Sequence, residues 1–261
     1  MFGAKAWRGH GYDLGRMTLR ELLVAYLTYP TILLYYALAA LGFAATLWLA
    51  EPGRWPWVLL SVAATGFFYP FLEYGLHRFV LHNRALYKSP LTAKVWKRIH
   101  FDHHQDPHRL EVLFGSVDTL LPTVVIATLP IGWAIEGAAG AAASLTTGLL
   151  FACFYEYCHC LQHLNVTPKS RWLARIKQRH LAHHFHYEKG NFGITTHVLD
   201  HAFGTFYGAT RDVPKSPTAF NLGYDEAEAL RYPWVARLSG GPPRSRPPGG
   251  GRGAEAVGAG R

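Results

Sequence analysis

Residues 137–163 read GAAGAAASLTTGLLFACFYEYCHCLQH, in which the first 19 residues carry no charge and the last five contain two histidines. A helix needs about 20 predominantly apolar residues to cross the hydrocarbon core of a bilayer. His159 and His163 are four positions apart, so they share one face of such a helix. This stretch predicts a membrane-crossing helix that carries imidazoles at one end.

Three further runs without a charged residue have about the same length: residues 22–50, 55–72 and 119–135. The first run is longer than one crossing needs, and Thr18 and Glu21 stand before it at the spacing of a capping box. Because Pro30 interrupts the run, we expect an interfacial helix over 18–29 and the first span over 30–50.

Composition supports a membrane protein. Of the 261 residues, 49% are hydrophobic and only 16% are charged, whereas charged residues make up about a quarter of ordinary soluble domains. Only short links, around 51–54 and 136–140, join the runs within each pair. The sequence therefore predicts an all-α integral membrane protein with four transmembrane helices in two hairpins, the second span ending near His77 and the fourth near His159.

Basic residues predict the orientation. Of the 26 lysines and arginines, 24 lie before residue 22, between residues 82 and 111, or after residue 164. Since cytoplasmic loops carry the excess of basic residues, both termini and the middle loop are expected in the cytoplasm. The net charge of +9 is then explained by topology and by anionic lipid headgroups, and we expect no nucleic-acid partner.

Histidine is the unusual component, with 15 residues, ten of which fall in four motifs. The motifs are HRFVLH with His77 and His82, HFDHH with His100, His103 and His104, HCLQH with His159 and His163, and HLAHH with His180, His183 and His184. All lie at or beyond the predicted cytoplasmic ends of the spans. Each HxxHH motif presents three imidazoles on one helix face. His77 and His82 differ by about 140° on a straight helix, so either the helix loosens there or the two rings serve different metals.

Ten imidazoles exceed what one ion uses, whereas two ions with about five ligands each keep a position open, so a dinuclear centre is expected in a histidine-rich cytoplasmic cap. Imidazole suits zinc, copper, iron and nickel alike, and ligand type alone leaves the metal open. Carboxylates that accept the second ring N–H commonly orient such ligands. The candidates for that role are Glu73, Asp102, Asp106, Glu156 and Asp200.

The chain divides into four expected parts: a cytoplasmic N-terminus with the interfacial helix (1–29), the four-span domain with the histidine motifs (30–207), a cytoplasmic extension (208–238) and a disordered tail (239–261). The tail assignment rests on composition, since 12 of its 23 residues are Gly or Pro. Cys153, Cys158 and Cys160 are an odd number within eight positions, which excludes a disulfide framework.

The four histidine motifs, in this order and with hairpins between them, resemble the fatty acid hydroxylase and sterol desaturase superfamily of integral-membrane di-iron enzymes, over about residues 70–207. HHFHYEKGNFGITTHVLDHAFGT (183–205) and HHQDPHRLEVLF (103–114) look most like fatty acid 2-hydroxylases. The resemblance implies that all ten motif histidines bind two iron ions. The spacing of the histidines is equally compatible with zinc at the same site after purification.

The resemblance also implies an O2-dependent hydroxylase that acts on the acyl chain of a fatty acid or acyl lipid, at C2. A sterol or carotenoid hydroxylase or a desaturase of the same superfamily is the alternative, and a membrane metal transporter is the alternative from another class. Many eukaryotic members carry an N-terminal cytochrome b5 domain, which the 21 residues before the first apolar run are too few to fold. We therefore expect a separate electron donor of the ferredoxin or cytochrome b5 type.

Overall fold

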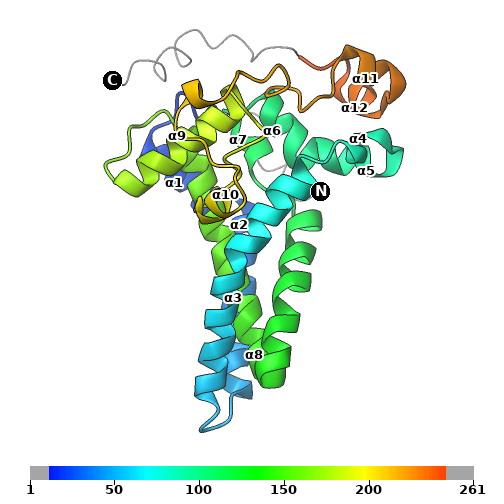
Figure 1. Cartoon of the computed structure of the whole chain (residues 1–261). Helices are drawn as coiled ribbons and strands as arrows, with labels where there is room; N and C mark the ends of the chain where they lie inside the picture. The colour runs from blue at the N-terminus through cyan, green and yellow to red at the C-terminus, as the bar shows by residue number, and fades with distance from the viewer. Residues whose placement is uncertain (1–11, 245–261) are drawn as a thin grey trace.

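The computed structural model describes residues 12–244, and within this range every element of regular secondary structure is a helix (Figure 1). The all-α prediction is confirmed for this part of the chain. Most of the tail expected at 239–261 lies outside the described residues. Its first residues follow α12 (Trp234–Ser239), and the main chain of Arg244 hydrogen-bonds the side chain of Gln105.

The first two helices meet at Pro30. In α1 (Leu19–Thr28) the Thr18 hydroxyl accepts from the Glu21 N–H, and the Glu21 carboxylate accepts from the Thr18 N–H at 2.8 Å, so the predicted capping box is present. Proline fits the first turn of a helix because that turn leaves its N–H groups without partners. Accordingly, α2 (Pro30–Leu49) begins at Pro30, and the chain changes direction between the two helices.

Three helical stretches are long and apolar enough to cross a membrane: residues 30–49, 55–81 and 110–163. The second consists of α3 (Trp55–Gly75) and the π-helix η1 (Leu76–Leu81), and the third consists mainly of α8 (Val117–His163). In Figure 1 these helices run side by side as the stem of the molecule. The chain is accordingly a membrane protein.

Helix α8 folds back on itself at Glu136 and Gly137, whose backbone angles are not helical. Gly137 has a φ of 52°, a value that glycine adopts without strain. On either side of this turn, a Cβ added to Gly132 would lie 2.0 Å from the carbonyl oxygen of Gly140. Two residues eight positions apart touch only if the chain reverses, so α8 supplies two antiparallel apolar segments.

The turn in α8 is tied to the α2–α3 link by Arg54. Its guanidinium donates two hydrogen bonds to the Glu136 carboxylate, at 2.8 and 2.6 Å. Such a two-bond fork fixes the orientation of both groups. The two hairpins are thereby joined at the end of the stem opposite the histidines.

The remaining elements gather at the other end of the stem (Figure 1). They are α4 (Ala85–Lys88), α5 (Pro90–Trp96), the π-helix η2 (Lys97–Phe101), α6 (Asp102–Gln105), α7 (Leu110–Leu113), α9 (Arg171–Phe185), α10 (Val198–Ala202), the 3-10 turn Thr210–Asp212, α11 (Glu226–Arg231) and α12. α4, α5, α11 and α12 form a side lobe around the buried rings of Tyr87, Trp96 and Tyr224. Three of the other elements, η2, α6 and α9, carry six of the motif histidines.

Candidate metal centre

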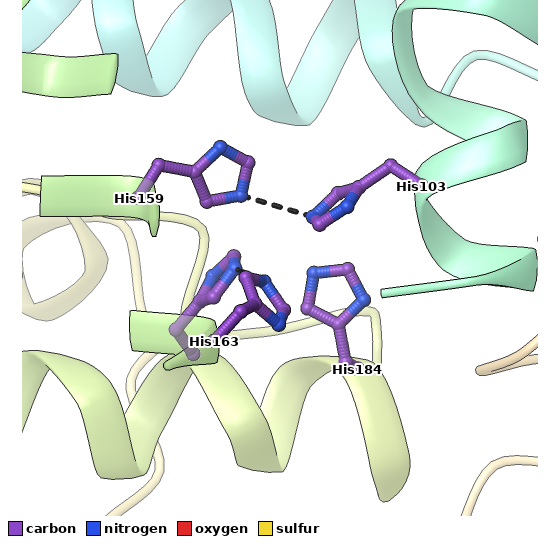
Figure 2. Close-up of side chains that lie close together, drawn as sticks. His103, His159, His163 and His184 are labelled. Carbon is purple, nitrogen blue, oxygen red and sulfur yellow. Dashed lines mark hydrogen bonds between the residues drawn. The ribbon is translucent and has the colours of Figure 1, made fainter. Parts of the chain in front are cut away.

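Nine of the ten motif histidines lie in two groups, in each of which one ligand atom per ring is within 4.8 Å of the others. The first group, four members of which are labelled in Figure 2, comprises His103, His159, His163, His180 and His184. The second group comprises His77, His82, His100 and His183. Each group draws on three of the four sequence motifs, so the fold brings together residues more than 75 positions apart.

The tenth histidine, His104, lies between the two groups. Its ring centre is 4.1 Å from that of His184 in the first group and 4.6 Å from that of His100 in the second. The structure thus arranges the rings as five and four with one between them, rather than as the expected five and five. Adjacent histidines do diverge as expected, since His183 and His184 belong to different groups.

A π-helix brings His77 and His82 together. The N–H of His82 donates to the carbonyl of His77, five residues earlier, and the two ring centres are 5.0 Å apart. In a π-helix residues i and i+5 share a face, whereas in an α-helix they do not. Of the two explanations that the sequence left open, the loosened helix is the one observed.

Two regular helices position most of the first group. His159 and His163 lie one turn apart near the end of α8, with ring centres 5.4 Å apart. His180 and His184 are likewise one turn apart in α9, at 4.5 Å. Figure 2 shows His103 reaching across from α6 toward His159, where their Nε2 atoms are 2.9 Å apart.

Main-chain carbonyls orient three of the rings. The Nδ1 of His104 is 2.8 Å from the Ala219 oxygen, that of His183 is 2.8 Å from the Gly190 oxygen, and that of His77 bonds the Phe192 oxygen. A carbonyl only accepts, so Nδ1 carries the proton in each ring. The lone pair is then on Nε2, and in all three rings this atom is buried without a hydrogen-bond partner.

The expected carboxylate partners of the rings are not found, and that prediction was wrong. None of the five candidate acids accepts a hydrogen bond from the ten rings. Glu73 instead accepts from the N–H groups of Ile194 and Thr195, at 2.6 and 2.8 Å. Asp200 accepts from the N–H groups of Phe192 and Gly193, both at 2.8 Å. These two acids hold the loop that carries two of the orienting carbonyls.

Sequence reasoning missed this loop, residues 190–197, because a main-chain carbonyl oxygen is present in every residue type. One local signal was available. Asn191 has a positive φ of 55°, which asparagine tolerates better than most residues, and glycines flank it at 190 and 193. The Gly-Asn-x-Gly pattern, which begins at Gly190 shortly after the HLAHH motif, therefore indicates a tight turn.

The rings are neutral. Burial lowers the pKa of His104 and of His183 to about 3. Burial and neighbouring rings also lower the pKa of His100, His103, His180 and His184 well below the usual value. Neutral imidazole is the form that binds metals.

The unpaired nitrogens fit metal ions. The Nε2 atoms of His77, His104 and His183 and both nitrogens of His184 are buried without a hydrogen-bond partner. A buried polar atom left unpaired is costly unless something binds it. The Nε2 atoms of His163 and His180 are 2.8 Å apart, and two nitrogens bound at right angles to one ion at about 2.1 Å would lie about 3.0 Å apart.

Fold and site together define a helical membrane protein with a histidine-rich centre suited to metal ions. The profile of the fatty acid hydroxylase family matches residues 62–205. The chain belongs to this family, as the histidine motifs predicted.

Relatives agree with this membership. The chain is 32% identical over 157 residues to the ceramide very long chain fatty acid hydroxylase SCS7 of Saccharomyces cerevisiae, covering 58% of this chain and 38% of that protein. It is 30% identical over 142 residues to the fatty acid 2-hydroxylase of Mus musculus, covering 53% and 37%. The chain thus spans little more than a third of the length of these two relatives.

Two further matches cover a larger share of both chains. The dihydroceramide fatty acyl 2-hydroxylase FAH2 of Arabidopsis thaliana is 29% identical over 189 residues, which are 72% of this chain and 76% of that protein. The solved structure of full-length Scs7p, in which only the hydroxylase domain is visible, matches with a TM-score of 0.53 and 26% identity, covering 78% of this chain and 71% of that one.

Proposed function

We propose that the protein is a membrane oxidoreductase that hydroxylates the acyl chain of a fatty acid or acyl lipid, at C2, with two iron ions, O2 and electrons from a separate donor. The observation that carries the proposal is the meeting of ten imidazoles from four motifs at one end of the apolar helices, where seven of the rings have a buried nitrogen without a hydrogen-bond partner. The names of the relatives support fatty acid hydroxylation, and their 2-hydroxylase members support C2.

The two histidine groups would each hold one ion, with His104 able to serve either. Iron in such a site would supply the reduction of O2 by two electrons, which insertion of oxygen into an unactivated C–H bond requires. The overall reaction consumes O2, two electrons and two protons, and yields the alcohol and water. The electron carrier, of the ferredoxin or cytochrome b5 type, completes this balance.

The chain's own residues orient the imidazole rings and exclude water from the centre. The Ala219, Gly190 and Phe192 carbonyls fix the protonated nitrogen of three rings, so that the other nitrogen faces the centre. Eight of the nine grouped histidines are buried and His82 is partly buried, which keeps bulk water from the reacting carbon. Neither role consumes or releases a proton.

The proposed topology has four crossings, namely α2, α3 with η1, and the two antiparallel segments of α8. By the distribution of basic residues, the histidine end faces the cytoplasm together with both termini. A bilayer-dissolved acyl chain would then reach the centre from between the helices, while the electron donor would approach from the cytoplasm.

Lipid mass spectrometry of cells with and without the protein tests the function. We expect a gain of one oxygen on saturated acyl chains, with fragmentation placing the hydroxyl at C2. Cells that express His184→Ala at the same level should lack this product. A new double bond would indicate a desaturase, and oxygen on a sterol or carotenoid ring with unchanged acyl chains would exclude acyl hydroxylation.

A further inference from the structure

A cavity of about 410 Å³ lies beside the second histidine group. It is lined by Arg78, Phe79, His82, Arg84, Glu188, Lys189, Phe192 and Leu222. His82 belongs both to this wall and to the histidine group, and the ring centre of Phe192 is 5.2 Å from that of His82. Phe79 is 61% exposed, so the cavity reaches the surface at the end of the α3 span. Whatever fills this space is adjacent to the proposed centre.

The cavity carries an uncompensated positive charge. Three of its lining residues are cations, Arg78, Arg84 and Lys189, and one is an acid, Glu188. Within residues 12–244 none of these four side chains takes part in an ion pair. A concave wall with a net charge of two attracts and concentrates anions.

Neutral groups hold the two arginines in place. Arg78 donates to the Tyr74 hydroxyl at 2.7 Å, and its guanidinium lies 5.0 Å from the ring centre of Phe79. The Arg84 guanidinium packs against Gly223, where an added Cβ would lie 2.3 Å from Cζ. These contacts limit the motion of both arginine side chains but do not neutralise their charges. Binding of an anion would therefore cost less side-chain entropy.

Glu188 adds an unfilled acceptor. Its residue is 2% exposed, Oε1 accepts from the Thr218 hydroxyl at 2.5 Å, and Oε2 is buried without a partner. A buried carboxylate oxygen of this kind calls for a donor. The cavity therefore offers its three cations to an anionic group, while the Glu188 carboxylate is buried in the wall.

We propose that this cavity binds the anionic head of the acyl substrate, a carboxylate or a phosphate, and so selects a charged acyl lipid over a neutral one. The inference rests on the proposed function, whose substrate class it narrows. Guanidinium groups bind carboxylate and phosphate oxygens through paired hydrogen bonds. A head held here has its first acyl carbons next to His82 and the apolar rings of Phe79 and Phe192, with the remaining chain free to lie in the bilayer.

Binding to the iron-loaded protein in neutral nanodiscs tests this inference separately from turnover. The probes are radiolabelled palmitic acid for a carboxylate, dipalmitoyl phosphatidic acid for a phosphate, and C16 ceramide for a neutral head. We expect at least one anionic probe to bind more tightly than ceramide, and the tighter of the two identifies the head. Ceramide binding as tight as that of both anions would overturn the inference.

Charge variants show whether the cavity is responsible. Arg84→Gln with Lys189→Gln should weaken binding of the preferred anion about tenfold, leave ceramide binding and iron content unchanged, and raise KM more than it lowers kcat. The control pair, Lys169→Gln with Arg211→Gln, removes the same charge from exposed positions outside the cavity and should have no effect. Equal weakening by both pairs would mean that only the general surface charge attracts the lipid. Cavity-dependent binding without any hydroxylated product would instead contradict the proposed function and leave the anion site standing.

Discussion

The N–H of His82 bonds the carbonyl of His77 at 3.2 Å, so one π-helical turn sets the spacing of two proposed ligands. This pair belongs to the group of four, whereas His184 belongs to the group of five. We predict that His82→Ala and His184→Ala each lower the iron content of reconstituted protein from two toward one per chain, measured by elemental analysis. His201→Ala alters an exposed ring outside both groups and should retain two. Full iron content in both ligand variants would contradict the two-ion proposal.

Glu73 is expected to act on the centre through the loop. Glu73→Ala removes the acceptor of three hydrogen bonds from Ile194 and Thr195, which should cost on the order of 3 kcal/mol of unfolding free energy. The loop then holds the Phe192 carbonyl less firmly, and metal affinity should fall about 10- to 100-fold. Thermal unfolding and iron titration measure the two effects.

Two further variants separate this role from a general loss of charge. Glu73→Gln keeps one acceptor oxygen and should recover most of the metal affinity. Glu51→Ala, an exposed acid in the α2–α3 link, should change neither quantity. Loss of affinity in Glu73→Gln equal to that in Glu73→Ala would show that the negative charge itself is required.

The turn in α8 depends on close approach of two glycines. Gly132→Ala would bring a methyl group to 2.0 Å from the Gly140 carbonyl oxygen, and the segments must separate to admit it. We expect a loss of about 1–3 kcal/mol, seen as a lower midpoint of thermal unfolding in detergent. Gly66→Ala meets Phe151 at an ordinary 3.5 Å and should be neutral or slightly stabilising. Equal midpoints for the two variants would exclude the tight packing.

Acid should destabilise the metal-free protein. His104 and His183 have a pKa of about 3 when folded and an ordinary value near 6.5 when unfolded, because burial disfavours the charged ring. Below pH 6.5 the unfolded chain binds protons that the folded chain refuses, so stability is complete above that pH and falls as the pH drops toward 3. Unfolding midpoints measured from pH 7.5 to 5 should decline, and less steeply in the double variant His104→Leu with His183→Leu. A midpoint independent of pH would refute this.

Cysteine labelling tests the proposed topology. The three native cysteines are buried, so an introduced thiol can be labelled selectively. Glu51 and Ala138 are exposed at the end of the stem opposite the histidines and suit this purpose. We expect Glu51→Cys and Ala138→Cys to react with an impermeant reagent from outside the cell, and Lys169→Cys only after permeabilisation. Reaction of Lys169→Cys in intact cells would reverse the orientation.

Much of the fold could be predicted because it depends on local patterns. Uncharged runs mark the long helices, Thr18 and Glu21 mark the start of α1, and Pro30 separates α1 from α2. The short helices around the centre carry no such signal, since their apolar faces pack on partners distant in sequence. The reversal within α8 was predicted from the link around 136–140, where Gly137 allows it.

For the site, helical spacing predicted which histidines share a face. It left the loosened helix at His77 and His82 as one of two possibilities, because a five-residue spacing is compatible with both. Carboxylates were expected to bind the rings, since acids are the usual visible partners. In the fold, Glu73 and Asp200 meet the loop instead, and its carbonyls meet the rings. Every residue type has a main-chain carbonyl, so the sequence does not show which residues orient the rings.

Main-chain acceptors also affect how the protein tolerates mutation. Any substitution of Ala219 or Phe192 leaves a carbonyl oxygen in the chain, so a change of residue type at these positions does not remove the partner of His104 or His77. A carboxylate in that role would be lost with a single codon change. Glu73 and Asp200 are the vulnerable positions instead, because one missense mutation there loosens the loop that orients both His77 and His183. Harmful variants of this centre should therefore be found not only at its histidines but also at residues that hydrogen-bond none of them.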